Sequence, residues 1–480
     1  MAIRNFPYGR WIGLDTTNTA DNMSDRYLVT LTNAHVDIRG QIVKGPGTSI
    51  IEAVPGGGEV ISLQHHHHDD TVLYYRNGAD IDALATGTDL TLAAAFTGST
   101  ARVDTVQFAG KQVVVSKGQT PVVYDPSTGF AQDAGIPSGG VVTTVLNRLV
   151  VADLPNETEL QIGKLNTIND FVVPGSPTSV SPLTIDILNQ LTGVDSIRGL
   201  GNFEGDKLAI FCQNETLVYA ASEDRSNWTI VRDFRVPFGT IGRGSIQRVG
   251  NDIFFCSAHG LHSLRRSING LTLETILFSR LVQDLYTDLR DAMPSEGEPT
   301  ASWNPNLGLF TIYFPTTTSW VRMVFHYDPQ SVRGGFQGWS YADNDGLSAA
   351  SYFGGDFRTA GNGYIRNGGD PAAAVNMTVR TPTLYQGAPH KEKSYKRLYV
   401  RASGEAQFDV NAYDENGRLL QSTTHQPFPP TPWNTGIPTV APERPVSIPF
   451  NHRAYGVSVE IVSTGEGELK ILDMAIDVKV

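Results

Sequence analysis

The chain has 480 residues, a formal net charge of -12 and a pI near 5.4. Tight binding to nucleic acid needs clustered Lys and Arg, so this charge excludes a protein that coats DNA, although an acidic wall lets DNA pass. Two cysteines exclude a disulfide-dense scaffold. The start shows no secretory signal and no long apolar run predicts a membrane span, so we expect a protein made and folded in a cytoplasm.

The first segment, residues 1–50, is polar and contains few positions suited to a core. A segment that cannot bury apolar surface stays extended until another surface orders it. We therefore predict an extended N-terminal arm over residues 1–50.

A run of four histidines follows in Gln64–Asp70, QHHHHDD, directly before the first clear hairpin. In a strand, His65 and His67 point to one face and His66 and His68 to the other. Each pair, with a nearby aspartate, offers only part of the tetrahedral ligand set that structural zinc prefers. We expect a solvated rim or a subunit contact, with adventitious metal binding or a pH-sensitive joint as alternatives.

Between residues 51 and 374, short alternating apolar runs are broken by Gly, Asn and Asp, and each pair of runs predicts two strands joined by a tight turn. The turns lie near residues 77, 109, 147, 205, 251, 307 and 355. Gaps of roughly 40–60 residues suit the four-stranded blade of a propeller. We predict an all-β fold in which residues 51–374 form a β-propeller of about six or seven irregular blades, with unrelated hairpins in sandwiches as the alternative.

A weak internal repeat supports the propeller. Ile210–Leu217 aligns without gaps with Phe254–Leu261, which places Cys212 and Cys256 at the same position of the repeated unit. Equivalent positions in neighbouring blades are usually strand interiors, so we expect both cysteines to be small buried core residues.

One segment breaks the strand pattern, because apolar residues recur at helical spacing over Leu271–Met293. This spacing predicts one amphipathic helix with a core-facing stripe. Residues 375–480 predict a separate C-terminal β-sandwich, with turns at Asn416-Gly417 and Gly465–Gly467.

A Pro-rich stretch, residues 426–445, interrupts this sandwich and predicts a long stiff loop. Its prolines lower the entropy lost on binding, so the loop can reach a neighbour with Phe428 and Trp433 as anchors. The alternative is a mere spacer between two strands.

The basic cluster His390–Arg397 lies at the entry to the sandwich. We expect its lysines, Lys391 and Lys393, to lie on a solvated or inter-subunit face, although contact with DNA or an acidic neighbour is the other interpretation.

Signatures of catalysis are weak. Ser222–Trp228, SEDRSNW, is similar to the Asp box of sialidase propellers but lacks its glycine and has its tryptophan one residue early, and such a box is a structural turn. The glycine-rich stretches Gly242–Ser245 and Gly45–Ser49 do not fit a phosphate-binding loop. We find no signature that demands hydrolase chemistry, and we predict no catalytic, cofactor-binding or metal-ligating residues.

Three stretches together carry a family resemblance: LVTLTNAHVDIRGQIVKGPGTS near the start, Arg232–Arg266 followed by FHYDPQ and GGFQGW, and the final KRLYVRASG with VEIVSTGEGELKILDMAIDVKV. Together they resemble the tail hub or nozzle proteins of short-tailed bacteriophages, also called packaged-DNA stabilisation proteins. The resemblance covers most of the chain. It implies a propeller-containing subunit that forms a homohexameric ring below the portal and head-to-tail adaptor, beside or above a tail needle, fibres or tailspikes.

On this resemblance we expect a structural virion protein of the tail, assembled in the host cytoplasm, and not an enzyme. The ring would continue the DNA channel and help to retain and then eject the genome, which would slide past acidic walls without specific binding. One alternative is a propeller glycan hydrolase or depolymerase, with clustered carboxylates and arginines at the propeller mouth. Another is a carbohydrate-binding adhesin, against which the six scattered tryptophans argue mildly.

Overall fold

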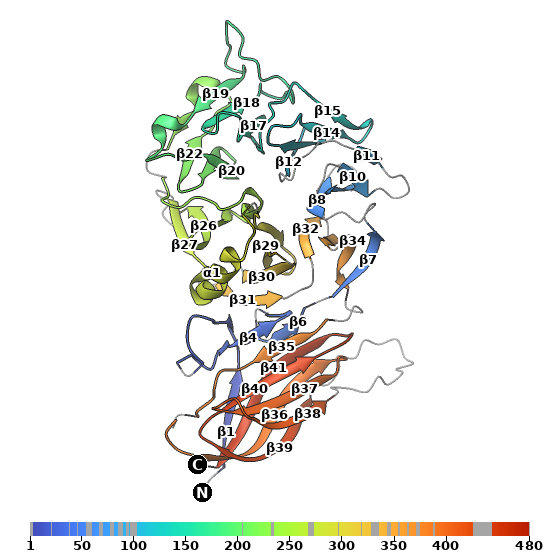
Figure 1. The fold of residues 1–480 in the computed structure, drawn as a ribbon, viewed down its shortest axis with the longest axis vertical. Helices are drawn as coiled ribbons and strands as arrows, with labels where there is room; N and C mark the ends of the chain where they lie inside the picture. The colour runs from blue at the N-terminus through green and yellow to red at the C-terminus, as the bar shows by residue number, and fades with distance from the viewer. Residues whose placement is uncertain are drawn as a thin grey trace.

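The computed structural model describes residues 3–20, 22–37, 39–45, 47–53, 60–66, 71–76, 81–84, 90–92, 96, 103–203, 205–231, 235–266, 273–295, 297–317, 319–327, 336–342, 347–353, 356–361, 364–370, 375–386, 389–425 and 444–479. Figure 1 shows a ring of small sheets above a sandwich that holds both ends of the chain. Among the described residues, no helix is long and apolar enough to cross a membrane.

The ring consists of seven four-stranded units, which confirms the predicted β-propeller. The first four blades are β8 (Val60–His66), β9 (Thr71–Arg76), β10 (Ile81–Leu84) and β11 (Leu90–Leu92); β12 (Val103–Phe108), β13 (Lys111–Ser116), β14 (Val122–Asp125) and β15 (Gly129–Gln132); β16 (Val141–Val145), β17 (Arg148–Ala152), β18 (Glu159–Ile162) and β19 (Leu183–Asp186); β20 (Ile197–Phe203), β21 (Lys207–Cys212), β22 (Thr216–Ala220) and β23 (Thr229–Ile230).

The last three blades are β24 (Gln247–Val249), β25 (Asp252–Ser257), β26 (Gly260–Arg266) and β27 (Leu273–Leu277); β28 (Thr300–Asn304), β29 (Leu309–Pro315), β30 (Trp320–Tyr327) and β31 (Phe336–Ala342); β32 (Leu347–Phe353), β33 (Asp356–Gly361), β34 (Tyr364–Asp370) and β7 (Gly47–Ala53). In this last blade β7 pairs antiparallel with β34, although hundreds of residues separate them along the chain. β32 in turn contacts β8, so the last blade closes the ring onto the first.

Strands inside the blades are buried almost without interruption and are mostly apolar, because each blade packs against a neighbour on both faces. In β13 the run KQVVVS is buried from its second residue onward, and the whole of β17 is buried. Cys212 and Cys256 lie, as expected, in the second strands of the fourth and fifth blades and are fully buried.

The predicted helix is much shorter than expected. Its first part, Leu273–Leu277, is β27, the outer strand of the fifth blade, and pairs with β26. A 3-10 turn (η6, Ser279–Val282) then leads into α1, which covers only Gln283–Asp291. Pairing with β26 completes the four strands of the blade. The hydrogen bonds of this pairing outweigh the helical spacing of the apolar residues in this segment.

The C-terminal sandwich has two sheets. One holds β39 (Arg444–Ala454), β36 (Lys393–Gly404), β41 (Leu469–Lys479), β6 (Ile42–Lys44), β5 (Ala34–Val36) and β1 (Ile3–Gly9); the other holds β4 (Thr30–Thr32), β35 (Met377–Arg380), β40 (Val457–Ser463), β37 (Phe408–Asp414) and β38 (Leu419–His425). Buried and less buried residues alternate along β41 and β37, as expected where only one face of a sheet meets the core.

Residues 1–50, predicted to be an arm ordered only by a partner, are instead held by this same chain. β1 pairs with β41 over seven residues, and β5 and β6 extend the same sheet. A short parallel pair, β2 (Gly13–Leu14) with β3 (Tyr27–Leu28), lies between them in sequence. Leu28, Leu31 and Ile42 of this segment are almost fully buried and complete a core that distant strands begin.

The propeller and the sandwich share one sheet. β4 lies between β31 of the sixth blade and β35 of the sandwich, so nine strands run without a break from β28 to β38. One apolar core accordingly includes Phe254 and Trp339 of the propeller and Val400 and Ile476 of the sandwich.

Close backbone contact seals this joint. A Cβ on Gly338 would lie 1.7 Å from the Ile12 carbonyl oxygen, and a Cβ on Gly13 would lie 2.8 Å from the Trp339 nitrogen. Both glycines also have positive φ, 149° and 142°, a conformation that other residues rarely adopt. The N-terminal segment therefore crosses the sixth blade only because both positions lack a side chain.

Candidate functional site

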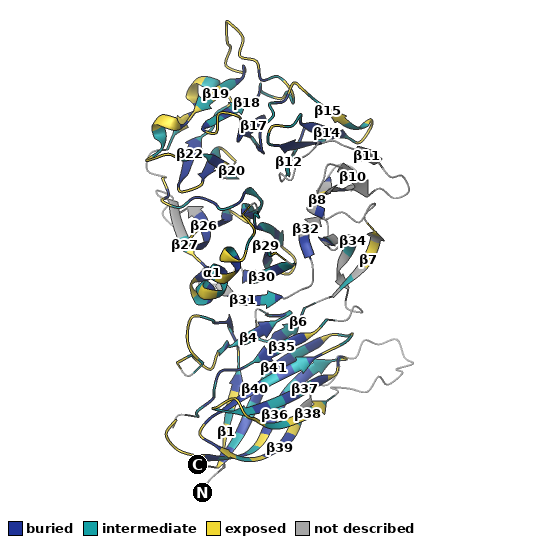
Figure 2. Ribbon diagram, in the orientation of Figure 1, coloured by how far each residue is buried: buried dark blue, intermediate teal, exposed yellow. Residues whose placement is uncertain are grey.

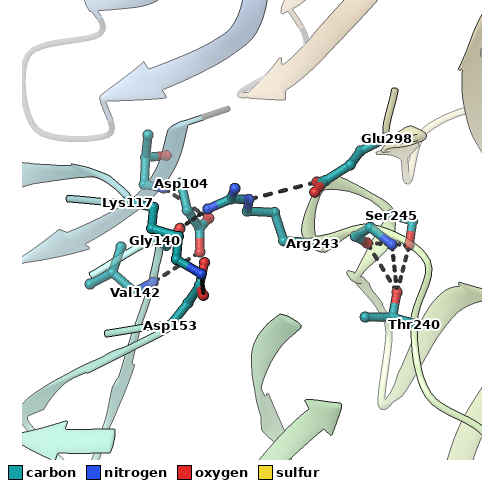
Figure 3. A network of polar contacts seen from close by, with 11 residues as sticks. Asp104, Lys117, Gly140, Val142, Asp153, Thr240, Arg243, Ser245 and Glu298 are labelled. Atoms are coloured by element: carbon teal, nitrogen blue, oxygen red, sulfur yellow. Dashed lines mark hydrogen bonds and ion pairs between the residues drawn. The ribbon is translucent and has the colours of Figure 1, made fainter. Parts of the chain in front are cut away.

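The first strands of the blades contact one another around the propeller axis, including β12 with β16, β16 with β20, and β28 with β32. In Figure 1 they lie on the inner side of the ring, with the later strands of each blade outside. The loops that precede these first strands lie on one face of the ring, which we call the mouth of the propeller, and ionisable residues gather there (Figure 3).

Arg243 links loops of three blades across this mouth. It begins the 3-10 turn η5 (Arg243–Ser245), directly before β24. Its Nη1 donates to the carbonyl of Gly140, before β16, and its Nε lies 3.6 Å from the carboxylate of Glu298, before β28. The guanidinium thus ties the third blade to the fifth and sixth, as Figure 3 shows.

The turn that carries Arg243 is held by buried hydroxyl groups. Thr240 Oγ1 donates to the carbonyls of Gly242 (3.0 Å) and Cys256 (3.1 Å). Ser245 Oγ donates to the carbonyl of Gly242 at 2.7 Å and accepts from the Cys256 amide at 3.2 Å. These bonds fix the direction in which the arginine leaves the backbone.

Asp104, on β12, accepts hydrogen bonds from the amides of Val142 and Thr105, both at 2.9 Å. Burial raises the pKa of its carboxyl group to about 6, although the Val142 amide and the charge of Arg243 favour the ionised form. This carboxylate joins the second blade to the third at the mouth of the propeller.

A second ion pair lies beside it. Lys117, between β13 and β14, places its Nζ 2.8 Å from a carboxylate oxygen of Asp153 and 2.8 Å from one of Glu157. Burial would lower the pKa of Lys117, but both carboxylates outweigh burial and raise it. Gly140 leaves room for this cluster, because a Cβ there would lie 2.2 Å from Asp153 Oδ2.

The cluster therefore holds its charged groups in fixed positions, with four carboxylates against two cations. Each carboxylate described above is bound by a cation or by backbone amides, and the arginine is bound by a carbonyl and a carboxylate. Such groups fasten blades together at the mouth. Elsewhere in the described part of the chain, no group of three or more His, Cys, Asp or Glu side chains could hold a metal ion.

Within the histidine run only His66 has a described side chain, and it does not lie on the expected solvated rim. His66 is fully buried at the end of β8, with its ring 5.3 Å from that of Tyr124 of the next blade in an edge-on contact. One face of β8 packs on the second blade, so every second side chain turns inward. His65 lies in β8 opposite Val72 and its side chain, like the whole of His67, falls outside the described residues.

The predicted interface lysines separate. Lys391 is exposed, whereas Lys393 is buried, and its Nζ donates to the carbonyls of Lys391 (3.0 Å) and Tyr455 (2.9 Å). Burial lowers the pKa of Lys393. Lys393 therefore stabilises the sandwich and does not offer its charge to a neighbour. Phe428 and Trp433 lie outside the described residues.

The stretch similar to an Asp box is a structural turn between β22 and β23. Asp224 caps the 3-10 turn η3 (Arg225–Asn227) by accepting from the Ser226 amide at 2.9 Å. Trp228 Nε1 donates to the Ser222 carbonyl at 2.7 Å. These bonds serve the conformation of the turn itself, while the Arg225 amide and the Glu223 carbonyl join it to Ser179 and Arg148 of the third blade.

Sequence reasoning missed Arg243 and Asp104. Arg243 lies in the Gly242–Ser245 stretch, which was weighed only as a phosphate loop, and Asp104 is one acidic residue among many. The sequence marks both residues only as charged residues next to an apolar strand. This pattern is too common in the chain to identify a site.

No known family model matches this chain, and no curated protein matches it either. Among solved structures, Raptor of Chaetomium thermophilum aligns with a TM-score of 0.45 and 11% identity, over 68% of this chain and 30% of that one. The β-propeller domain of Myceliophthora thermophila Cps50 (Swd1) aligns with a TM-score of 0.41 and 9% identity, over 67% of this chain and 98% of that one. At such identities these similarities concern the fold alone.

Proposed function

We propose that this chain is a structural subunit of a virion, the ring-forming tail nozzle or hub of a short-tailed bacteriophage, and that it has no enzymatic activity. The observation that carries the proposal is the nine-stranded sheet that joins the sixth blade to the sandwich. A shared sheet and a continuous core make the two parts one body, and a subunit that bears load between a capsid and a tail needs this rigidity.

The charge of the chain supports the same role. Each copy carries -12, so a ring of copies would present an acidic wall to DNA if this charge faces the lumen. A wall of like charge does not hold phosphates, and DNA slides past it without specific binding. A constriction, or a plug below the ring, would then retain the genome.

The carboxylates at the propeller mouth argue against a glycan hydrolase. Glycoside hydrolysis uses two carboxyl groups that flank the scissile bond, one of them as acid or base. Asp153 and Glu298 are held by Lys117 and Arg243, and Asp104 accepts from two backbone amides. Their bonds are those of a structural cluster.

Electron microscopy of virions and of the purified chain tests the proposal. We expect negative-stain images of the chain to show rings, and antibodies against the chain to label the tail of the particle. Particles assembled without the chain should lose their DNA. A chain absent from purified virions, or one that cleaves the host's surface glycan, would contradict the proposal.

The Pro-rich loop offers a second test. Deletion of Phe428–Trp433 should leave a soluble, β-rich chain that no longer enters tails, because the two aromatic anchors are removed. Normal tails from this variant would show that the loop is only a spacer.

A further inference from the structure

The turn between β37 and β38 contains the pair Asn416-Gly417. In such a pair the glycine amide nitrogen can close a five-membered ring onto the side-chain carbonyl carbon of the asparagine, and glycine has no Cβ to hinder the approach. The described part of the chain holds an asparagine followed by glycine twice, at Asn416-Gly417 and at Asn367-Gly368. The two pairs lie in very different surroundings.

The turn at Asn416-Gly417 is open to solvent. Both residues are exposed, and exposed positions continue along β38 in Figure 2. A Cβ built on Gly417 would have no atom within 4 Å beyond its neighbours in the chain. The Gly417 amide donates to the Asp414 carbonyl at 3.1 Å. Freeing this nitrogen therefore breaks one exposed hydrogen bond and displaces no packed group.

The side chain of Asn416 lies beside a carboxylate that joins two turns. Its Nδ2 donates to Glu415 Oε1 at 3.3 Å. The other carboxylate oxygen, Glu415 Oε2, accepts from the amides of Tyr455 (3.2 Å) and Gly456 (3.3 Å), in the turn between β39 and β40. Glu415 thus forms a bridge between the two turns, and Asn416 is one of its donors.

The pair Asn367-Gly368 lies instead inside β34, in the seventh blade. Asn367 is paired with Arg358 of β33 on one side and with Ser49 of β7 on the other. Ring closure rotates the backbone of the asparagine, so at this position it would break hydrogen bonds to both neighbouring strands. A paired inner strand opens far more rarely than an exposed turn.

We propose that Asn416 is a site of spontaneous deamidation. The nitrogen of Gly417 bonds to Cγ of Asn416, the bond from Cγ to Nδ2 breaks, and ammonia leaves with the proton of the Gly417 amide. Water then opens the imide ring at either of its two carbonyl carbons. The product at position 416 is an aspartate or an isoaspartate, and both carry a negative charge that asparagine lacks.

This conversion would weaken the Glu415 bridge. The Nδ2 donor to Glu415 is lost, and a new carboxylate stands next to Glu415 and close to Asp414 in the chain. Like charges at such short range repel one another. We expect the turn between β37 and β38 to separate from the turn between β39 and β40. The inference is independent of the proposed ring.

Mass spectrometry of the aged chain tests the site. Trypsin releases Asn416 in the peptide Ala402–Arg418 and Asn367 in the peptide Asn367–Arg380, and fragment ions assign the converted residue. In the folded chain, kept in mildly alkaline buffer, conversion should be at least about tenfold faster at position 416 than at position 367, because β34 must open first. In urea the two positions should react at similar rates. Equal conversion in the folded chain, or an Asn416 that stays intact while the unfolded chain reacts, would overturn the inference.

Two variants test the reaction and its consequence. Asn416→Gln should not convert under the same conditions, because its longer side chain would have to close a six-membered ring, and conversion at the same rate would overturn the proposed reaction. Asn416→Asp places the product's charge in the turn from the start. The amides of Tyr455 and Gly456 should exchange hydrogen faster in Asn416→Asp than in Asn416→Gln, since the charge repels Glu415. Equal exchange would overturn the weakening of the bridge.

Discussion

Replacing Arg148 by methionine should release the loop between β18 and β19. The substitution keeps an unbranched apolar side chain in the core and removes only the guanidinium. That group donates to the carbonyls of Gly163, Ser179 and Ser181 within 3.1 Å, to that of Val180 at 3.3 Å and to that of Glu223 at 2.5 Å. Without it, five carbonyl groups lose this donor.

The magnitude follows from these bonds. A hydrogen bond to a charged group contributes about 1.5–3 kcal/mol, so five such bonds would sum to more than about 7 kcal/mol. The losses are not additive, because the loop can open and let water reach its carbonyls. We therefore expect the free energy of unfolding to fall by about 3–5 kcal/mol, because each carbonyl left buried without a donor costs about 1–3 kcal/mol and opening of the loop relieves part of this cost.

Urea denaturation measures the total loss, and hydrogen exchange locates it. The amide of Leu165, which donates to the Val180 carbonyl at 3.1 Å, should exchange rapidly in the variant, while amides of β25 stay protected. Arg198→Met is the control, because Arg198 is exposed and its removal should change stability by less than about 0.5 kcal/mol. A loss below about 1 kcal/mol for Arg148→Met, with Leu165 still protected, would refute the reasoning.

Three further predictions concern the joint, the mouth of the propeller and the blades. His35 contacts His326 at 5.9 Å between the sandwich and the propeller, and burial, followed by the charge of His326, lowers the pKa of His35 to about 4. Between about pH 6.5 and pH 4 the unfolded chain therefore binds more protons than the folded chain. As the pH is lowered through this interval, the free energy of unfolding should fall by up to about 3 kcal/mol. In His35→Gln the urea midpoint should depend less on pH over the same interval. Gly140→Ala should cost about 1–3 kcal/mol, because its methyl group displaces the ionic side chains of the mouth of the propeller, and a melting temperature equal to that of the wild type would contradict this. Cys212→Ala and Cys256→Ala should each cost about 1 kcal/mol in urea titration without affecting assembly, and a variant that folds but fails to assemble would show a functional thiol.

Local patterns in the sequence were sufficient to predict the blades. Alternation and tight turns are encoded within a few residues, so the hairpins of β12 with β13 and β25 with β26 were expected from the sequence. The candidate site was not, because Arg243 and Asp104 come together only when the second, third, fifth and sixth blades have assembled around one axis.

The sequence by itself determined an all-β chain with repeated blades, a sandwich at its end and two cysteines in equivalent strands. Only the tertiary structure decided that β7 closes the propeller, that β4 joins it to the sandwich and that Arg148 is surrounded by carbonyl groups. The physical reason is distance along the chain. A strand's tendency to extend is set by nearby residues, but its pairing partner is set by the free energy of the whole fold. A short segment such as Thr30–Thr32 becomes a strand only because strands of the propeller and of the sandwich lie on either side of it.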